Sequence, residues 1–252
     1  MSLLWLELGL LDGIYFELVR HGPWDSETED DGMYTKHKWE SDRYFNFGYV
    51  TYFPKDYEEG KKYPLVFFLH GAGQRGDDLD FSCRHGFMKH VRETGADYPF
   101  LFVAPQCPSG KFWGCYTESL LAFLDFICET LPVDRERVYL TGLSMGGTGA
   151  WMLAMAAPER FAALAPICGS GIYWYGEALT KIPIMVYHGD CDEIVPIQNS
   201  IEMIKAVNKR GGNAQIKVLY GVGHNAWDEA YAGDELYTWM LSHKRVAEEE
   251  EK

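Results

Sequence analysis

Apolar residues gather in short runs along most of the chain, and longer segments with helical spacing lie between these runs. A short apolar run bounded by Gly or Pro is typical of a strand in a parallel sheet, because helices cover both of its faces. The runs occupy residues 44–52, 65–69, 100–104, 138–140, 164–167, 184–187 and 216–220. The intervening segments predict helices over residues 81–94, 118–130, 145–157, 197–209 and 227–243.

This alternation predicts an α/β fold: a doubly wound, mostly parallel sheet with helices on both faces and no large cap domain. We expect the domain to span residues 41–245. An extension at residues 1–40 would pack on it or precede it, and an acidic, disordered tail at residues 246–252 would follow. Such sheets bind ligands at the carboxyl ends of their strands. The loops after the apolar runs are therefore where chemistry is expected.

Charge excludes several classes of function. The 252 residues carry 37 acidic and 23 basic side chains, which gives a formal net charge of −14. An acidic chain repels phosphate backbones and anionic lipid, so we expect neither a nucleic-acid nor a membrane partner. The acidic cluster at residues 25–31 is expected to be a solvated loop rather than an interaction surface.

The cysteines indicate a reducing environment and no metal site. Six of them are dispersed through the chain, and none forms a CxxC pair. Reduced thiols are typical of cytoplasmic proteins, so we expect a cytoplasmic location. The sequence calls for neither a metal nor an organic cofactor.

The strongest motif is G-L-S-M-G-G at residues 142–147, between an apolar run and an Ala-rich helical segment. Serine is a poor nucleophile at neutral pH, so it must be exposed and held beside a base. A sharp strand-to-helix turn of the G-x-S-x-G type exposes it. We therefore predict Ser144 as a nucleophile, and the amide of Met145 at the helix start as a donor to the oxyanion.

The order of residues along the chain selects the base. In this architecture the acid follows the serine and the histidine comes last. Three histidines follow Ser144. His188 precedes both of the aspartates between Ser144 and His224, and His243 lies at a helix end beside basic residues. His224 lies in a glycine-rich loop directly after a strand, and it is the predicted base.

Asp190 and Asp192 compete for the role of acid in the same loop. Asp192 lies deeper in the loop and has the better reach to an imidazole, so it is the predicted acid. Asp190 is expected to close an Asx turn. The turn after residues 65–69 should supply the second oxyanion donor, which we predict to be the amide of Ala72, with that of Gly73 as the alternative.

Aromatic side chains near these loops are candidates for contact with substrate. Trp113 and Gln106 follow the strand at residues 100–104, and Trp113 is expected to overlook the serine. Trp174 lies in a short insert at residues 169–181. Trp227 follows the base by three residues, and a core position is equally open for it. The insert is too short for a large cap, so we expect an open, shallow site.

The motifs resemble those of the α/β-hydrolase superfamily, in particular phospholipase/carboxylesterase and dienelactone-hydrolase-like esterases near the feruloyl-esterase-like and predicted-peptidase branches. The resemblance covers roughly residues 44–243. It rests on residues 63–73, 104–108, 142–147, 188–196 and 223–224. It implies Ser144 as nucleophile, Asp192 as acid and His224 as base. It also implies amide donors from the residue after the serine and from the turn at residues 70–73.

Together these observations predict a serine carboxylesterase that hydrolyses small or aromatic acyl esters, including carbohydrate-linked ones, through an acyl-enzyme. The expected partner is a small-molecule ester; the sequence does not indicate an oligomeric state. Two alternatives stay open. One is a serine peptidase of the same fold, and the other is a non-catalytic binding protein on a hydrolase fold.

Overall fold

A computed structural model describes residues 33–245 of the protein. The predicted acidic loop at residues 25–31, most of the predicted extension and the predicted tail lie outside the described residues. The centre of the molecule is an eight-stranded sheet with the strand order β1-β2-β4-β3-β5-β6-β7-β8. The strands are β1 (Thr35–Trp39), β2 (Phe47–Tyr52), β3 (Tyr63–Leu69), β4 (Leu101–Pro105), β5 (Val133–Leu143), β6 (Ala163–Ile167), β7 (Ile184–Gly189) and β8 (Ala214–Leu219).

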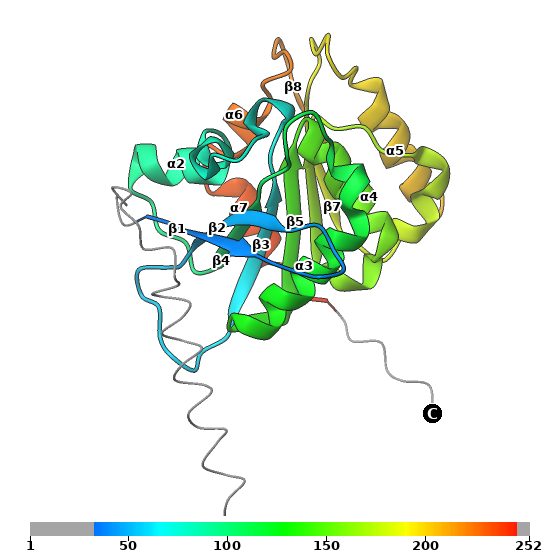
Figure 1. The fold of residues 1–252 in the computed structure, drawn as a ribbon. Coiled ribbons are helices and arrows are strands. Elements are labelled where there is room, and N and C mark those ends of the chain that lie inside the picture. Colours follow the sequence, from blue (N-terminus) through cyan, green and yellow to red (C-terminus); the bar gives the residue numbers. More distant parts are fainter. Residues whose placement is uncertain (1–32, 246–252) are drawn as a thin grey trace, which may run out of the picture.

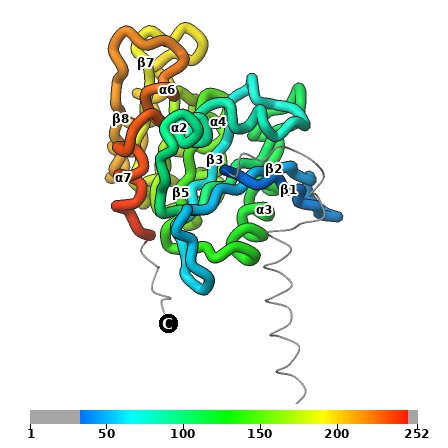
Figure 2. Tube along the Cα trace, turned by 90° about the vertical axis from the view of Figure 1, so that its left-hand side faces the viewer, coloured from blue at the N-terminus to red at the C-terminus, as the bar shows by residue number. Residues whose placement is uncertain are grey.

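Strands β3 to β8 run parallel, and β1 and β2 join them as an antiparallel pair at one edge. Helices cover both faces (Figure 1). One face carries α3 (Thr117–Thr130), α4 (Met145–Ala156) and α5 (Gln198–Asn208). The other carries α2 (Phe87–Thr94), α6 (Trp227–Ala230) and α7 (Glu235–Leu241), which face the viewer in Figure 2. The predicted doubly wound α/β fold is confirmed.

The central strand β3 explains why this arrangement is stable. All seven of its residues are buried, and successive side chains point to opposite faces. Leu65 and Phe67 belong to one apolar cluster together with Phe123 of α3, whereas Phe68 belongs to the other together with Phe87 of α2. Each layer of helices therefore covers its own apolar core.

Strand β1 was not expected from the sequence, and it lies in the described part of the predicted extension. Its residues pair antiparallel with β2, so the sheet begins at Thr35 rather than after residue 40. The lysines Lys36 and Lys38 interrupt its apolar pattern. Such charges are common on edge strands, where they discourage pairing with a second chain.

Two predicted helices are each divided. The segment at residues 81–94 forms a short helix, η2 (Leu79–Cys83), and then α2, with Gly86 at a φ of 72° between them. The segment at residues 227–243 forms α6 and α7. Between β6 and β7 the chain forms the short helix η5 (Tyr173–Leu179), in keeping with the absence of a large cap domain. Within residues 33–245, no helix has both the length and the apolar character that a membrane crossing requires.

Candidate active site

Ser144 is the single residue between β5 and α4, and its backbone is strained. Its φ is 54° and its ψ is −116°, a conformation that costs a non-glycine residue about 1–3 kcal/mol. The N–H of Ser144 donates to the carbonyl of Ile167 at the end of β6, over 2.9 Å. The reversal of the chain leaves the serine at the carboxyl edge of the sheet, where it is partly exposed.

The glycines of the motif let α4 approach the strand ends closely. A Cβ atom on Gly146 would lie 1.8 Å from the carbonyl oxygen of Leu69 in β3. A Cβ on Gly147 would lie 2.5 Å from the carbonyl oxygen of Ile167, and one on Gly142 would lie 2.4 Å from that of Gly146. Each obstacle is a backbone atom, which cannot rotate away as a side chain can. The motif therefore meets a steric requirement of the turn.

Gly146→Ala is expected to lower the free energy of unfolding by about 3 kcal/mol or more, because the added methyl group must displace β3 or α4. For a chain of this length the melting temperature would fall by roughly 6–12 °C. Urea and thermal unfolding measure the change. Gly233→Ala is the matched control, since nothing lies within 4 Å of its Cβ position. Equal stability of the two variants would contradict the steric argument.

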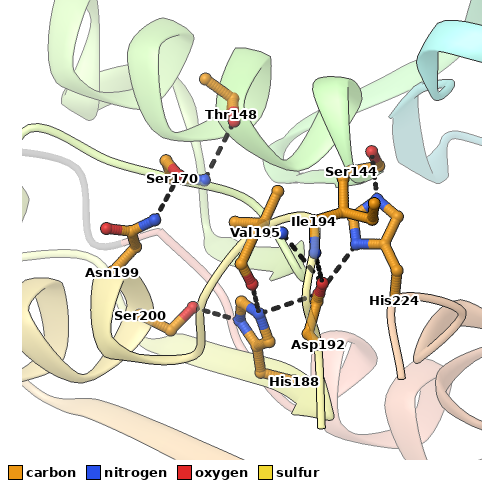
Figure 3. Close-up of polar contacts among 10 residues, drawn as sticks. All are labelled: Ser144, Thr148, Ser170, His188, Asp192, Ile194, Val195, Asn199, Ser200 and His224. Atoms are coloured by element: carbon orange, nitrogen blue, oxygen red, sulfur yellow. Dashed lines mark hydrogen bonds and ion pairs between the residues drawn. The ribbon is translucent and has the colours of Figure 1, made fainter. Parts of the chain in front are cut away.

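The three residues predicted as nucleophile, base and acid lie in one chain of hydrogen bonds (Figure 3). Ser144 Oγ lies 2.8 Å from His224 Nε2, and His224 Nδ1 lies 2.8 Å from Asp192 Oδ2. They come from the loops after β5, β8 and β7, respectively. A carboxylate only accepts hydrogen bonds, so Nδ1 carries the proton and the lone pair of Nε2 faces the serine. This arrangement can take a proton from the hydroxyl as it attacks.

Asp192 is held as a carboxylate by its hydrogen bonds. Its side chain is fully buried. Its Oδ1 accepts from the amides of Ile194 and Val195, each at 2.9 Å, and its Oδ2 accepts from His224. Burial by itself raises the pKa of Asp192. The hydrogen bonds from His224 and from the two amides outweigh burial and hold that pKa below its ordinary value.

Asp190 has a different role from the one expected. Its Oδ1 accepts from the amide of Gly221 at 2.7 Å, which ties the loop after β7 to the loop that carries His224. The expected Asx turn at Asp190 is therefore wrong. Asp192 forms that turn, because its side chain bonds the amides two and three residues further on.

The turn after β3 is fixed by His70. This side chain is fully buried; its Nδ1–H donates to the carbonyl of Gly71 at 2.7 Å, and its Nε2 accepts from the amide of Cys107 at 2.9 Å. Burial lowers the pKa of His70 to about 4, so the ring stays neutral and this pattern persists. Ala72 and Met145 begin the helices η1 (Ala72–Gln74) and α4. At that position an amide has no acceptor within its own helix.

Trp113 and Gln106 do not face the serine, which corrects the expectation for both. Trp113 is only 1% exposed; its Nε1–H donates to the carbonyl of His70 at 2.9 Å, behind the turn. Gln106 is 4% exposed, and its Nε2 donates to the carbonyls of Gln74 and Asp78. It also lines a cavity of about 410 Å³ between β1 and the loops after β3 and β4, and none of the three hydrogen-bonded site residues lines that cavity.

Trp227 contacts the predicted base, and Trp174 is exposed. The rings of Trp227 and His224 are nearly perpendicular, with centroids 5.2 Å apart and the planes at 89°. Trp174 is 61% exposed and contacts Tyr173 at a centroid distance of 4.7 Å. Its segment begins beside the first turn of α4, where a Cβ on Gly169 would meet Gly147.

A cation does not fit the site well. One ligand atom each from Cys168, Asp192 and His224 lies within 4.8 Å of the others. However, burial raises the pKa of the Cys168 thiol to about 12, so it keeps its proton at neutral pH. Asp192 and His224 already bind each other. Metal binding would therefore have to break that hydrogen bond and also deprotonate a buried thiol.

Sequence reasoning missed two residues that contact this site from behind. His188 lies 3.2 Å from Asp192, and Ser200 lies 2.7 Å from His188. In the sequence, His188 stands out only as a possible base. The signal for its contact with Asp192 is its position at the end of a strand, four residues before that aspartate.

Comparison with known proteins places the chain among esterases. The Esterase family, described as "Putative esterase", matches residues 46–230. "Probable feruloyl esterase C" of Aspergillus terreus is 28% identical over 168 residues, which cover 65% of this chain and 62% of the relative. The chain thus spans less than two thirds of that relative's length.

Solved structures agree. A thermostable esterase shares 32% identity with a TM-score of 0.76, covering 85% of this chain and 64% of its own. A ferulic acid esterase shares the fold at 21% identity with a TM-score of 0.66, and the match covers 79% of this chain and 95% of that esterase. With well over half of its length matched by the family and the expected fold in place, the chain belongs to the Esterase family within the α/β-hydrolase superfamily.

Proposed function

We propose that this protein is a serine carboxylesterase that cleaves small or aromatic acyl esters, including carbohydrate-linked ones. The observation that carries the proposal is the unbroken chain of hydrogen bonds from Ser144 through His224 to Asp192, which begins at a strained turn. Strain of this kind persists only where the surrounding structure enforces it, and it concentrates at functional sites.

Ser144 Oγ attacks the carbonyl carbon of the ester, and its proton passes to Nε2 of His224. Asp192 stabilises the imidazolium that results. The tetrahedral intermediate then expels the alcohol, which leaves with the proton from His224. The products of this half-reaction are a free alcohol and an acyl group on Ser144.

Water completes the cycle. His224 removes a proton from a water molecule, which attacks the acyl carbonyl and forms a second tetrahedral intermediate. Collapse of this intermediate returns the proton to Ser144 Oγ and releases the carboxylic acid. The steps need no cofactor, because Ser144, His224, the leaving alcohol and water account for every proton that moves.

The amides of Met145 and Ala72 donate to the oxyanion of both intermediates. Each is the first amide of a helix, so neither has to break an intrahelical bond to bind a ligand. Removal of one such donor costs about 10²–10³-fold in kcat in other acyl-transfer enzymes. The fixed turn at His70 and Gly71 keeps the Ala72 amide in place.

Exposed aromatic side chains support an aromatic acyl or sugar component in the substrate. Tyr173, Trp174 and Tyr175 are all exposed on η5. A flat, rigid ring gains contact area at little entropic cost. The relative named as a feruloyl esterase points in the same direction.

Trp174→Ala is expected to raise KM for a feruloyl ester by about 5–10-fold, the effect of losing one aromatic contact of roughly 1–1.5 kcal/mol. KM for an acetyl ester should stay within about twofold, because an acetyl group has no ring to pack against Trp174; it serves as the internal control. Steady-state kinetics on both esters measure the effect. An equal rise for the two substrates would exclude a specific contact with the aromatic group.

The proposal is tested with acetyl, butyryl, octanoyl and feruloyl esters, each compared with the matching amide. We expect ester turnover to exceed amide turnover by several orders of magnitude, with short and feruloyl chains ahead of octanoyl. Comparable amide turnover would favour the peptidase alternative. Absence of turnover on every ester, together with failure of a fluorophosphonate probe to label Ser144, would favour a non-catalytic protein.

A further inference from the structure

His188 is a buried histidine that the mechanism above does not use. It lies on β7, four residues before Asp192, and its side chain is fully buried. It cannot touch a substrate. Polar atoms in such a position nevertheless need partners, because a buried polar group without a hydrogen bond is destabilising.

The partners of His188 fix its protonation and its orientation. Burial lowers the pKa of His188, and the hydrogen bonds to Val195 and Asp192 offset that effect only in part, so the ring is neutral. Nε2 faces the carbonyl of Val195 at 2.8 Å. A carbonyl only accepts, so Nε2 carries the single proton. Nδ1 must then accept, and the hydroxyl of Ser200 donates to it at 2.7 Å.

The same Nε2 atom also lies beside the acid of the site. It lies 3.2 Å from Asp192 Oδ2, the oxygen that accepts from His224. One carboxylate oxygen thus lies between an N–H of His224, which donates to it, and Nε2 of His188 (Figure 3). The hydrogen bond to the Val195 carbonyl holds the backbone whose amide donates to Asp192 Oδ1. His188 therefore acts on both oxygens of the carboxylate, one directly and one through the loop.

We propose that His188, held by Ser200, is a positioning residue that sets the orientation of Asp192 toward His224. The inference rests on the proposed function, in which Asp192 supports the base. It adds to that function a second histidine, which contributes to the rate without contact with substrate or transfer of a proton.

Ser200 links this arrangement to the rest of the sheet edge. It lies in α5, next to Asn199, whose side-chain amide donates to Ser170 Oγ at 2.9 Å. The amide of Ser170 in turn donates to Thr148 Oγ1 in α4, also at 2.9 Å. These hydrogen bonds connect α4, which begins beside Ser144, to α5, whose Ser200 binds His188. The elements that hold the acid and the nucleophile are therefore connected to each other.

His188→Leu, which keeps the volume but removes both nitrogens, is expected to lower kcat for a p-nitrophenyl ester by about 10–100-fold, as does the loss of the outer-shell partners that orient the ligands in metal sites. KM should change less than about twofold, since His188 is remote from substrate. His188→Gln can again place an amide N–H near Asp192, so it should recover part of the loss. Ser200→Ala should give a smaller decrease, about 3–10-fold.

A double-mutant cycle with Asp192→Ala tests whether His188 acts through Asp192. If it does, His188→Leu should change kcat by less than about threefold in the Asp192→Ala background, because there is no carboxylate left to orient. Equal fold-changes in the two backgrounds would overturn the proposal. Should His188→Leu fail to fold in thermal unfolding, the same cycle with Ser200→Ala decides the question by the same criterion.

His37→Leu is the matched control for the loss of a largely buried histidine. His37 lies in β1 and hydrogen-bonds Thr51, far along the sheet from the site. This variant should lose stability and keep kcat within about twofold. If Asp192→Ala alone leaves kcat unchanged, the proposed function fails. If Asp192→Ala lowers kcat and neither His188→Leu nor Ser200→Ala does, only the positioning role fails.

Discussion

Replacement of Ser144 by alanine is expected to lower kcat for a p-nitrophenyl ester by about 10⁴–10⁶-fold. The variant has no hydroxyl to attack the carbonyl, and His224 then has no nucleophile to deprotonate except water. The residual rate comes from the oxyanion donors and from substrate binding, which the change leaves in place. Single-turnover and steady-state kinetics measure the fall, and labelling by a fluorophosphonate probe should disappear with it.

The loss is expected to be chemical rather than structural. The amide of residue 144 still donates to the carbonyl of Ile167, and alanine meets the same backbone strain as serine, so the melting temperature should change by only a few degrees. Ser242→Ala is the control: Ser242 follows α7, its hydroxyl donates to the carbonyl of Trp239 within that helix, and its removal should leave kcat unchanged. A Ser144→Ala variant that keeps more than a tenth of the ester turnover would remove Ser144 from the mechanism.

The parallel strands could be predicted from the sequence because both of their faces are buried. A strand such as β3 is a continuous apolar run, which few other elements resemble in so short a length. Strand β1 gives no such signal, since Lys36 and Lys38 lie at an edge where charge is tolerated. The divisions within residues 81–94 and 227–243 likewise depend on where the chain must turn to cover the sheet.

Ser144, Asp192 and His224 could be predicted because a local motif and the order of residues along the chain constrain their positions. The glycines around Ser144 report a steric requirement of one turn, and the order of acid and histidine follows from the order of the strands. The roles of Trp113 and Gln106 could not be predicted in this way. Both follow the ends of strands, but the side-chain N–H groups of both donate to backbone carbonyls of neighbouring turns. Which carbonyls need a donor is settled only by the tertiary packing.

The different roles of Asp190 and Asp192 also depend on tertiary packing, and replacing each of them should change kcat to a different extent. Asp192→Asn is expected to lower kcat by about 10⁴-fold. The amides of Ile194 and Val195 both donate to Oδ1, so the new asparagine must keep its oxygen there. Its Nδ2 donors would then face His224. The imidazole proton would move from Nδ1 to Nε2, and Nε2 would no longer have a lone pair for the proton of Ser144.

Asp190→Asn keeps an acceptor for the amide of Gly221 and leaves the charge of Asp192 in place, so kcat should fall less than about tenfold. The two variants remove the same charge from the same loop, two residues apart, so net charge and loop composition are matched. Steady-state kinetics at pH 7 separate them. A larger fall for Asp190→Asn than for Asp192→Asn would mean that the acid had been assigned to the wrong residue. We expect the larger loss of kcat for Asp192→Asn because Asp192 is buried and accepts a hydrogen bond from His224. Only this one of the two carboxylates can hold the proton on Nδ1 of His224.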